Sequence, residues 1–152
     1  MEYLGKIHVK WQTIYGATRR LAKKILKDWD VSAIVTIPLG GLPPTKFMAD
    51  LLRVTKEHVY ITSSLMRDAD YRYLVQKYHH GIILLFDEIV DSGKQMSETL
   101  KKLLTAKKNT RFDVKILTAT LYYKPVSSYR PDYYVVETSD WVVFPWEKFQ
   151  EK

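Results

Sequence analysis

The sequence predicts an α/β fold with an open, mainly parallel sheet flanked by helices. Two observations support this fold class: continuous apolar runs rich in β-branched residues, and segments of helical periodicity between them. Strands that alternate with helices along a chain favour a parallel sheet with crossover helices. The 152 residues contain no internal repeat or low-complexity segment and can bury a substantial core. We therefore expect a single domain, residues 1–152.

The first half of the chain predicts one helix, a strand, a second helix and a second strand. Residues 11–29 carry apolar side chains at intervals of three and four, as in an amphipathic helix. The continuous run 31–38, VSAIVTIP, is typical of a central parallel strand. After a Gly-Gly and Pro-Pro turn, Pro44 suits the first turn of a helix that ends near Leu52. Residues 57–65 predict the second strand.

The second half continues the alternation after one irregular segment. Residues 66–80 are polar and without a clean period, which predicts a functional loop or lid. Residues 81–86, GIILLF, predict the third strand, and a helix is expected from about Gly93 to Ala106. The fourth strand, the fifth strand and a short terminal strand are expected at residues 113–124, 131–137 and 141–147.

Composition restricts the class of protein. With 46% hydrophobic and 27% charged residues, disorder is not the main feature, and the absence of cysteine excludes disulfide and thiolate chemistry. No uncharged run approaches the roughly 18–20 residues of a membrane span, so we expect a cytoplasmic protein without a membrane partner. The net charge of +7 favours anionic partners such as phosphorylated metabolites or RNA, or else reflects a lysine-rich solvated surface.

The stretch ILLFDEIVDSGK, residues 83–94, concentrates the chemistry. Asp87 and Glu88 follow a buried run, where carboxylates are costly to desolvate unless sugar hydroxyls or phosphate-borne Mg²⁺ pair with them. Ser92 and Gly93 then stand at a strand-to-helix junction, where exposed N–H groups form a phosphate cradle. A Walker A loop is excluded because it needs glycine at position 88 and Ser or Thr at Gln95. The alternative is an ordinary turn capped by Asp91 or Ser92.

This stretch resembles the phosphoribosyl-pyrophosphate (PRPP) signature of type I phosphoribosyltransferases. The resemblance implies that Asp87 and Glu88 hold the ribose 2′- and 3′-hydroxyls. It also implies that Asp91 lies near purine N7 as the catalytic residue that removes or shares its proton. Mg²⁺ would be held mainly through PRPP, with Asp87 and Glu88 as candidate protein ligands. The 5′-phosphate would be bound by Asp91, Ser92, Gly93, Lys94 and Gln95.

Two further segments are similar to parts of the same family. The sequence IPLGG resembles the pyrophosphate loop, with Leu39, Gly40 and Gly41 as its binding residues. Purine members usually have Arg or Lys at the position of Leu39, so the pyrophosphate charge would fall to backbone N–H groups, Mg²⁺ and Lys46. The other reading of the two glycines is a tight turn. Residues 64–80 fall where the family has a mobile hood, in which we assign no catalytic residue.

The end of the chain is similar to the base-binding part of the archaeal and xanthine-guanine purine enzymes. In LYYKP, Lys124 would meet the oxygen at C6 of hypoxanthine, guanine or xanthine, because an ammonium group only donates hydrogen bonds. In DWVVFPWE, Trp141 would stack on the purine, the Val142 backbone would read its edge near C2, and Glu147 would assist. The alternatives are a solvated lysine at a strand end and tryptophans that complete the core.

The resemblance extends from about Trp11 to Glu147 and implies a Mg²⁺-dependent purine phosphoribosyltransferase of purine salvage. Its substrates would be PRPP and a 6-oxopurine base, its products a nucleoside 5′-monophosphate and pyrophosphate, and its assembly a homodimer or homotetramer. One alternative is an enzyme that uses adenine. Another is a non-catalytic PRPP-fold regulator that binds nucleotides and RNA, although nucleic acid is the less favoured partner.

Overall fold

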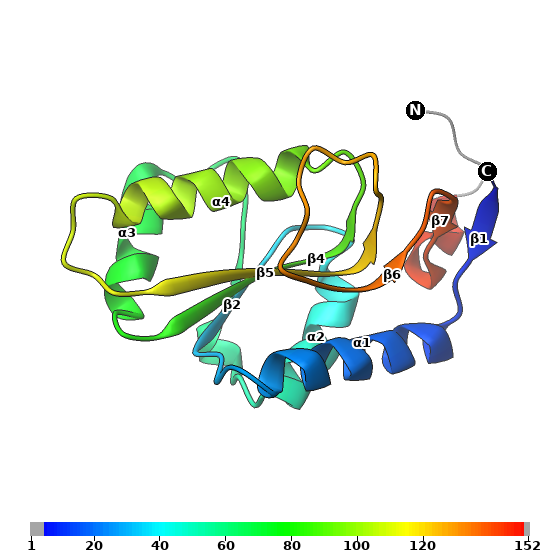
Figure 1. Cartoon of the computed structure of the whole chain (residues 1–152), viewed down its shortest axis with the longest axis horizontal. Helices are drawn as coiled ribbons and strands as arrows, with labels where there is room; N and C mark the ends of the chain where they lie inside the picture. Colours follow the sequence, from blue (N-terminus) through cyan, green and yellow to red (C-terminus); the bar gives the residue numbers. More distant parts are fainter. Residues whose placement is uncertain (1–4, 151–152) are drawn as a thin grey trace.

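The main sheet has five parallel strands in the order β3-β2-β4-β5-β6 (Figure 1). It is seen in a computed structural model that describes residues 5–150. The strands are β2 (Ala33–Thr36), β3 (Val59–Ile61), β4 (Ile82–Val90), β5 (Lys115–Tyr123) and β6 (Tyr133–Glu137). The predicted α/β fold is confirmed.

Two pairs of helices cover opposite faces of this sheet (Figure 1). They are α1 (Trp11–Leu26) and α2 (Leu42–Leu52) on one face, and α3 (Asp68–Lys77) and α4 (Lys94–Lys107) on the other. Side chains alternate between the faces, so Ile34 and Leu84 belong to the core under α1 and α2, whereas Val35 and Leu85 belong to the other core. Burial on both faces explains the continuous apolar runs in the sequence.

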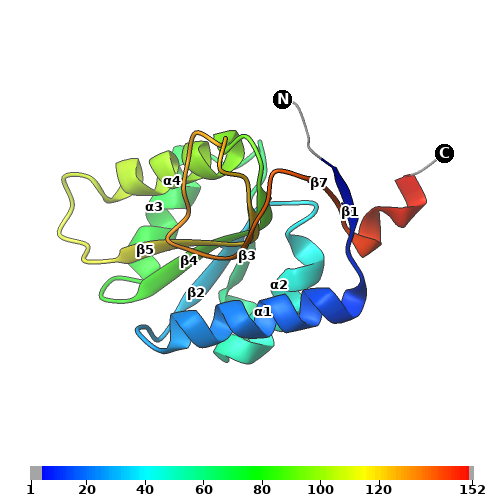
Figure 2. The same cartoon turned by 45° about the vertical axis from the view of Figure 1, so that its right-hand side comes forward.

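A second, two-stranded sheet lies beside the first (Figure 2). It pairs β1 (Lys6–His8) in parallel with β7 (Trp141–Val143). The sequence did not predict β1, because its three residues, Lys6, Ile7 and His8, are largely exposed and show no apolar run. The predicted terminal strand 141–147 stops at Val143, since a 3₁₀ turn begins at Pro145 and extends to Gln150.

The predicted loop at residues 66–80 is wrong for most of its length, because Asp68–Lys77 form α3. Tyr71, Leu74, Val75 and Tyr78 are buried against the sheet at helical spacing, and the polar residues between them obscured this period. The helix starts where the Arg67 backbone N–H donates to Asp70 at 2.7 Å. Residues 62–67 are the irregular part of the segment.

The third strand is longer than predicted. Strand β4 continues past Phe86 to Val90 and pairs with β5 through Asp87 and Thr120. The acid pair therefore lies inside a central strand, near its carboxyl end, rather than after the strand. Within residues 5–150, no helix is long and apolar enough to cross a membrane.

Candidate active site

Three chain segments meet where β2, β4 and β5 end, at the carboxyl edge of the sheet. Strand β4 lies between β2 and β5, so the loop after β2, the turn after β4 and the residue after β5 are neighbours. Open parallel sheets bind ligands at this edge because strand ends and helix N-termini leave polar backbone groups there. The predicted site residues lie on these three segments and on the nearby strand β7.

The acid pair on β4 is poorly compensated. Asp87 is only 6% exposed, and burial raises its pKa well above the usual range, with the neighbouring Glu88 carboxyl acting in the same direction. Burial also raises the pKa of Glu88, and the charge of Glu147 adds to this effect. The Glu88 backbone N–H donates to Asp87 Oδ1 at 2.9 Å, whereas Glu88 Oε2 has no hydrogen-bond partner within residues 5–150. The pair is suited to accept hydroxyl protons or a cation.

The loop 37–41 lies directly on these acids. A Cβ on Gly40 would overlap with the Glu88 carboxylate, and one on Gly41 would lie 2.8 Å from Thr36 Oγ1 and 3.2 Å from Asp87 Oδ1. Thr45 of α2 holds the loop by donating to the Gly41 carbonyl oxygen at 2.6 Å. Close approach of the loop to the acids therefore requires glycine at both positions.

Neither Leu39 nor Lys46 places a positive charge at this loop. Leu39 is 79% exposed, next to a cis peptide bond between Pro38 and Leu39. Lys46, the predicted cationic substitute, forms an exposed ion pair with Asp50 at 2.6 Å. The polar groups that the loop itself offers are consequently those of its backbone.

Residues 91–95, hereafter the phosphate turn, lead from β4 into α4. Gly93 precedes the helix with φ of 86°, a left-handed conformation that favours glycine. Ser92 Oγ accepts from the Lys94 backbone N–H at 3.2 Å, so its own proton is left to donate. A cavity of about 120 Å³ is lined by residues 87–93, Gln95 and Met96. The acids and the phosphate turn thus face one small cavity, which Lys94 does not line.

Lys124 follows β5 and is buried, with 1% of its surface exposed. Its Nζ donates to the Asp140 carbonyl oxygen. Burial lowers the pKa of Lys124, while the negative charges of Asp91 and Asp140 oppose this shift. The alternative of a solvated lysine at a strand end is wrong, because the ammonium group is held among protein oxygens.

Strand β7 brings Trp141 and Val142 to the same region. The Trp141 N–H donates to the Gly5 carbonyl at 2.8 Å, and the Val143 carbonyl accepts from the Val9 N–H at 2.9 Å. Because polar backbone groups alternate sides along a strand, Val142 directs its N–H and C=O away from β1. Trp141 remains 46% exposed and can present its ring to a ligand.

Glu147 and Trp146 have structural contacts. Glu147 Oε2 accepts from the Phe144 N–H at 2.8 Å, which closes the turn after β7. Its charge nevertheless acts on the pKa of Glu88. The Trp146 ring stacks on Phe144 with centroids 4.8 Å apart, which agrees with a tryptophan that completes the core.

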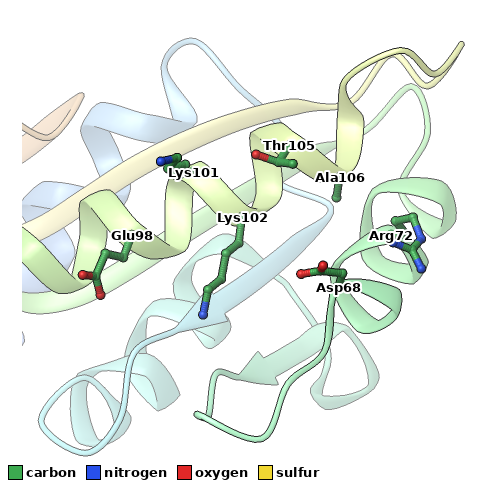
Figure 3. Close-up of a pocket in the computed structure, with 7 residues that line it drawn as sticks. All are labelled: Asp68, Arg72, Glu98, Lys101, Lys102, Thr105 and Ala106. Atoms are coloured by element: carbon green, nitrogen blue, oxygen red, sulfur yellow. The ribbon is translucent and has the colours of Figure 1, made fainter.

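A separate cavity of about 380 Å³ lies between α3 and α4 (Figure 3). Asp68 and Arg72 reach it from α3 and Lys102 from α4, so its lining mixes both charges. It contains none of the predicted site residues.

The sequence did not predict roles for Thr45 and Asp140 at the carboxyl edge. The only signals for them were a hydroxyl residue shortly after the Gly-Gly pair and an acid directly before Trp141.

Comparison with known proteins identifies the domain. Residues 8–148 match the model of the phosphoribosyl transferase domain. A xanthine-guanine phosphoribosyltransferase of Desulfotalea psychrophila is 25% identical over 96% of this chain and 89% of its own length. The enzyme of the same name from Idiomarina loihiensis is 27% identical over 91% of this chain and 85% of its own. The solved xanthine-guanine-hypoxanthine phosphoribosyltransferase of Helicobacter pylori shares the fold, with a TM-score of 0.75 at 23% identity over 99% and 97% of the two chains.

The domain match covers the main sheet, its helices and all three segments at the carboxyl edge. The resemblance to type I phosphoribosyltransferases is therefore confirmed. On this evidence, the chain belongs to the phosphoribosyl transferase domain family.

Proposed function

We propose that the protein transfers the 5-phosphoribosyl group of PRPP to a 6-oxopurine, releasing pyrophosphate and a nucleoside 5′-monophosphate. The observation that carries this proposal is the shared location of three features. The acid pair, the phosphate turn and the buried Lys124 lie at one sheet edge. Asp91, the first residue of the turn, is close enough to Lys124 for its charge to act on the pKa of the lysine. The names of the relatives, both xanthine-guanine phosphoribosyltransferases, support a purine acceptor.

The 120 Å³ cavity supports the assignment of ribose and phosphate. Asp87 and Glu88 accept hydrogen bonds from the ribose 2′- and 3′-hydroxyls, which relieves the raised free energy of two buried carboxyls. The phosphate turn binds the 5′-phosphate through the N–H groups that precede α4 and the Ser92 hydroxyl. Lys94 lies outside the cavity and contributes charge at longer range.

Pyrophosphate binds at the loop 37–41, where backbone N–H groups replace the cation missing at Leu39. The carboxylates of Asp87 and Glu88 are the hard oxygen donors that Mg²⁺ prefers. Within residues 5–150 no three acidic, histidine or cysteine residues are grouped as a metal site. As the family resemblance implies, PRPP itself would supply most of the Mg²⁺ ligands. Mg²⁺ held there by Asp87, Glu88 and PRPP would supply positive charge to the leaving pyrophosphate.

The base binds between Trp141 and Lys124. Lys124 donates to the oxygen at C6 and disfavours an amino group there, because ammonium cannot accept a hydrogen bond. The Val142 N–H and C=O face away from β1 and meet the base edge near C2. Stacking on Trp141 contributes about 1–3 kcal/mol. Glu147 acts through its charge and through the turn that it closes.

The reaction places little covalent chemistry on the protein. Displacement at the anomeric carbon passes through an oxocarbenium-like state, so positioning of both reactants and charge stabilisation dominate. Asp91 accepts or shares the N7 proton of the purine as the new bond forms. We assign the exclusion of water to residues 64–67, the irregular part of the segment 64–80 that was predicted as the hood.

The test offers Mg²⁺-PRPP together with one base at a time and follows pyrophosphate and nucleotide formation. We expect turnover with hypoxanthine, guanine or xanthine, and product from adenine alone would contradict the base assignment. Asp91→Asn should lower kcat by about 100-fold or more while ribose 5-phosphate still binds with nearly unchanged Kd. Equal losses in both would instead place Asp91 among the phosphate-binding groups.

The exposed Leu39 and the paired Lys46 favour a second candidate, a PRPP-fold regulator that binds nucleotides and RNA without turnover. Absence of turnover with every base, together with salt-sensitive RNA binding, would support it.

We also propose a cytoplasmic enzyme of purine salvage that forms a homodimer or homotetramer. Light scattering of the purified protein measures the assembly.

A further inference from the structure

The connection between β5 and β6, residues 124–132, lies against the phosphate turn. Ser128 donates two hydrogen bonds to the carbonyl oxygen of Ser92, one from its backbone N–H at 2.9 Å and one from its hydroxyl at 3.0 Å. A Cβ at Gly93 would lie 2.8 Å from the Tyr129 backbone nitrogen and 3.0 Å from Ser128 Oγ. The β5-β6 connection is therefore one wall of the turn and leaves room only for glycine at position 93.

These two bonds determine how the peptide between Ser92 and Gly93 is oriented. In a trans peptide the carbonyl oxygen and the following N–H point in opposite directions. Because Ser128 holds the Ser92 oxygen against the connection, the Gly93 N–H is directed away from the connection. The 120 Å³ cavity is lined by Gly93 and by no residue of the connection, which agrees with a Gly93 N–H that is directed towards the cavity. A reversed peptide would instead present a carbonyl oxygen to a phosphate and repel it.

The connection is itself anchored in the sheet. The Tyr129 hydroxyl is 2.9 Å from Oγ1 of the fully buried Thr118 on β5. The Asp132 carboxylate accepts from the Thr118 N–H at 2.9 Å, and the Ser127 hydroxyl donates to the Tyr129 carbonyl at 2.7 Å. These contacts limit where Ser128 can move, so the position of Ser92 is set from β5 as well as from β4.

We propose that Ser128 is a positioning residue, which orients the Gly93 N–H for the phosphate of the substrate. The inference rests on the proposed function, in which the phosphate turn binds the 5′-phosphate. The connection begins at Lys124, whose backbone N–H donates to Val90 at 3.0 Å. One segment therefore joins the lysine of the base site to the phosphate turn.

The variants Ser128→Ala and Ser128→Thr test the role of the hydroxyl. Ser97→Ala, which removes an exposed serine hydroxyl from α4, is the matched control. Ribose 5-phosphate is the probe, with its Kd measured by calorimetry and the Gly93 amide followed by NMR. We expect Ser128→Ala to raise this Kd and the KM for PRPP about fivefold, with kcat changed less than twofold. Ser128→Thr should restore both constants, and Ser97→Ala should change neither.

Unchanged Kd and KM in Ser128→Ala would overturn the inference. So would a fall in kcat and thermal stability that Ser128→Thr does not restore, because this indicates a merely structural role. The binding arm does not depend on turnover. If the wild-type protein binds ribose 5-phosphate and Ser128→Ala weakens it, but no base is converted, the proposed function fails and the role of Ser128 stands. If turnover occurs and Ser128→Ala has no effect, the reverse holds.

Discussion

Two buried charged regions at the carboxyl edge are stabilised differently in the free protein. On β4, Asp87 and Glu88 lie side by side, burial raises the pKa of both, and Glu88 Oε2 lacks a hydrogen-bond partner among the described residues. After β5, Lys124 donates to Asp140 and lies within reach of two negative charges. Lys124 thus has opposite charges and a hydrogen-bond acceptor beside it, which offset part of the effect of burial on its pKa, whereas each acid has another carboxylate beside it.

The difference indicates which part of the site is complete before substrate arrives. An ammonium group held by a protein oxygen keeps its position without a ligand, so the Lys124 end of the candidate site is preorganised. An uncompensated acid pair destabilises the free protein and gains most when hydroxyls or a cation bind to it. Neutralising Asp87 removes repulsion from Glu88, whereas loss of the Lys124 ammonium group takes a donor from the Asp140 carbonyl oxygen, so we expect stability to change with opposite sign at the two ends.

Asp87→Asn should have the largest effect on activity. We expect kcat/KM for PRPP to fall about 100-fold or more, because the ribose loses a charged acceptor. Stability should change in the opposite direction, with the free energy of unfolding at neutral pH rising by about 1 kcal/mol. Because the folded pKa of Asp87 is raised, stability is lost as pH rises from the ordinary value of about 4 towards the folded value. The gain from asparagine should accordingly vanish below about pH 4.

Urea unfolding of Asp87→Asn at several pH values, beside PRPP kinetics, measures both effects. Asp68→Asn, which neutralises an exposed acid on α3, should change stability little at any pH. If Asp87→Asn is less stable than the wild type at neutral pH, the charge of Asp87 is stabilised by its surroundings, and the proposed difference between the acid pair and Lys124 is wrong.

Lys124→Met should have the next largest effect and the opposite sign in stability. The Asp140 carbonyl oxygen loses its donor, and Asp91 loses a neighbouring positive charge. We expect the free energy of unfolding to fall by about 1–3 kcal/mol, and kcat/KM for 6-oxopurines to fall roughly 10- to 100-fold. Lys101→Met, at an exposed site in α4, is the control for loss of a charge. If Lys124→Met is more stable than the wild type, the buried charge of Lys124 destabilises the free protein as the acid pair does.

Gly40→Ala should have the smallest effect on activity, and it tests whether the loop 37–41 depends on its contact with the acid pair. The added methyl group overlaps with the Glu88 carboxylate, so either the loop 37–41 or Glu88 must move. We expect the KM for PRPP to rise roughly tenfold, because the two binding elements lose their mutual position. Gly16→Ala in α1 meets nothing within 4 Å and should stabilise the protein without changing KM. Equal kinetics in the two variants would show that the loop does not depend on contact with the acids.

The helices and the main strands could be predicted where their pattern is local. α1 and β2 followed from periodicity and from a β-branched run, and both are confirmed within a few residues. α3 was missed because polar side chains separate its buried positions, so the tertiary contacts of Tyr71 and Leu74 decided its structure. β1 was missed because its partner, β7, is more than 100 residues away.

The candidate site shows the same division. The composition and spacing of residues 87–95 were sufficient to predict a sugar and phosphate site, and the structure brings these residues to one cavity. No pattern indicated Ser128, because its contact with Ser92 spans 36 residues. Nor could the sequence separate a solvated Lys124 from a buried one, since the burial depends on Asp140 and the end of β5.

By itself, the sequence determined the α/β fold, the acid pair and the phosphate turn, because helix periodicity, strand burial and turn chemistry depend on neighbours along the chain. Only the tertiary structure decided which charges are compensated and which peptide groups face the cavity. Those properties arise where β2, β4, β5 and β7 bring distant residues together, and the low dielectric of that junction sets their pKa values.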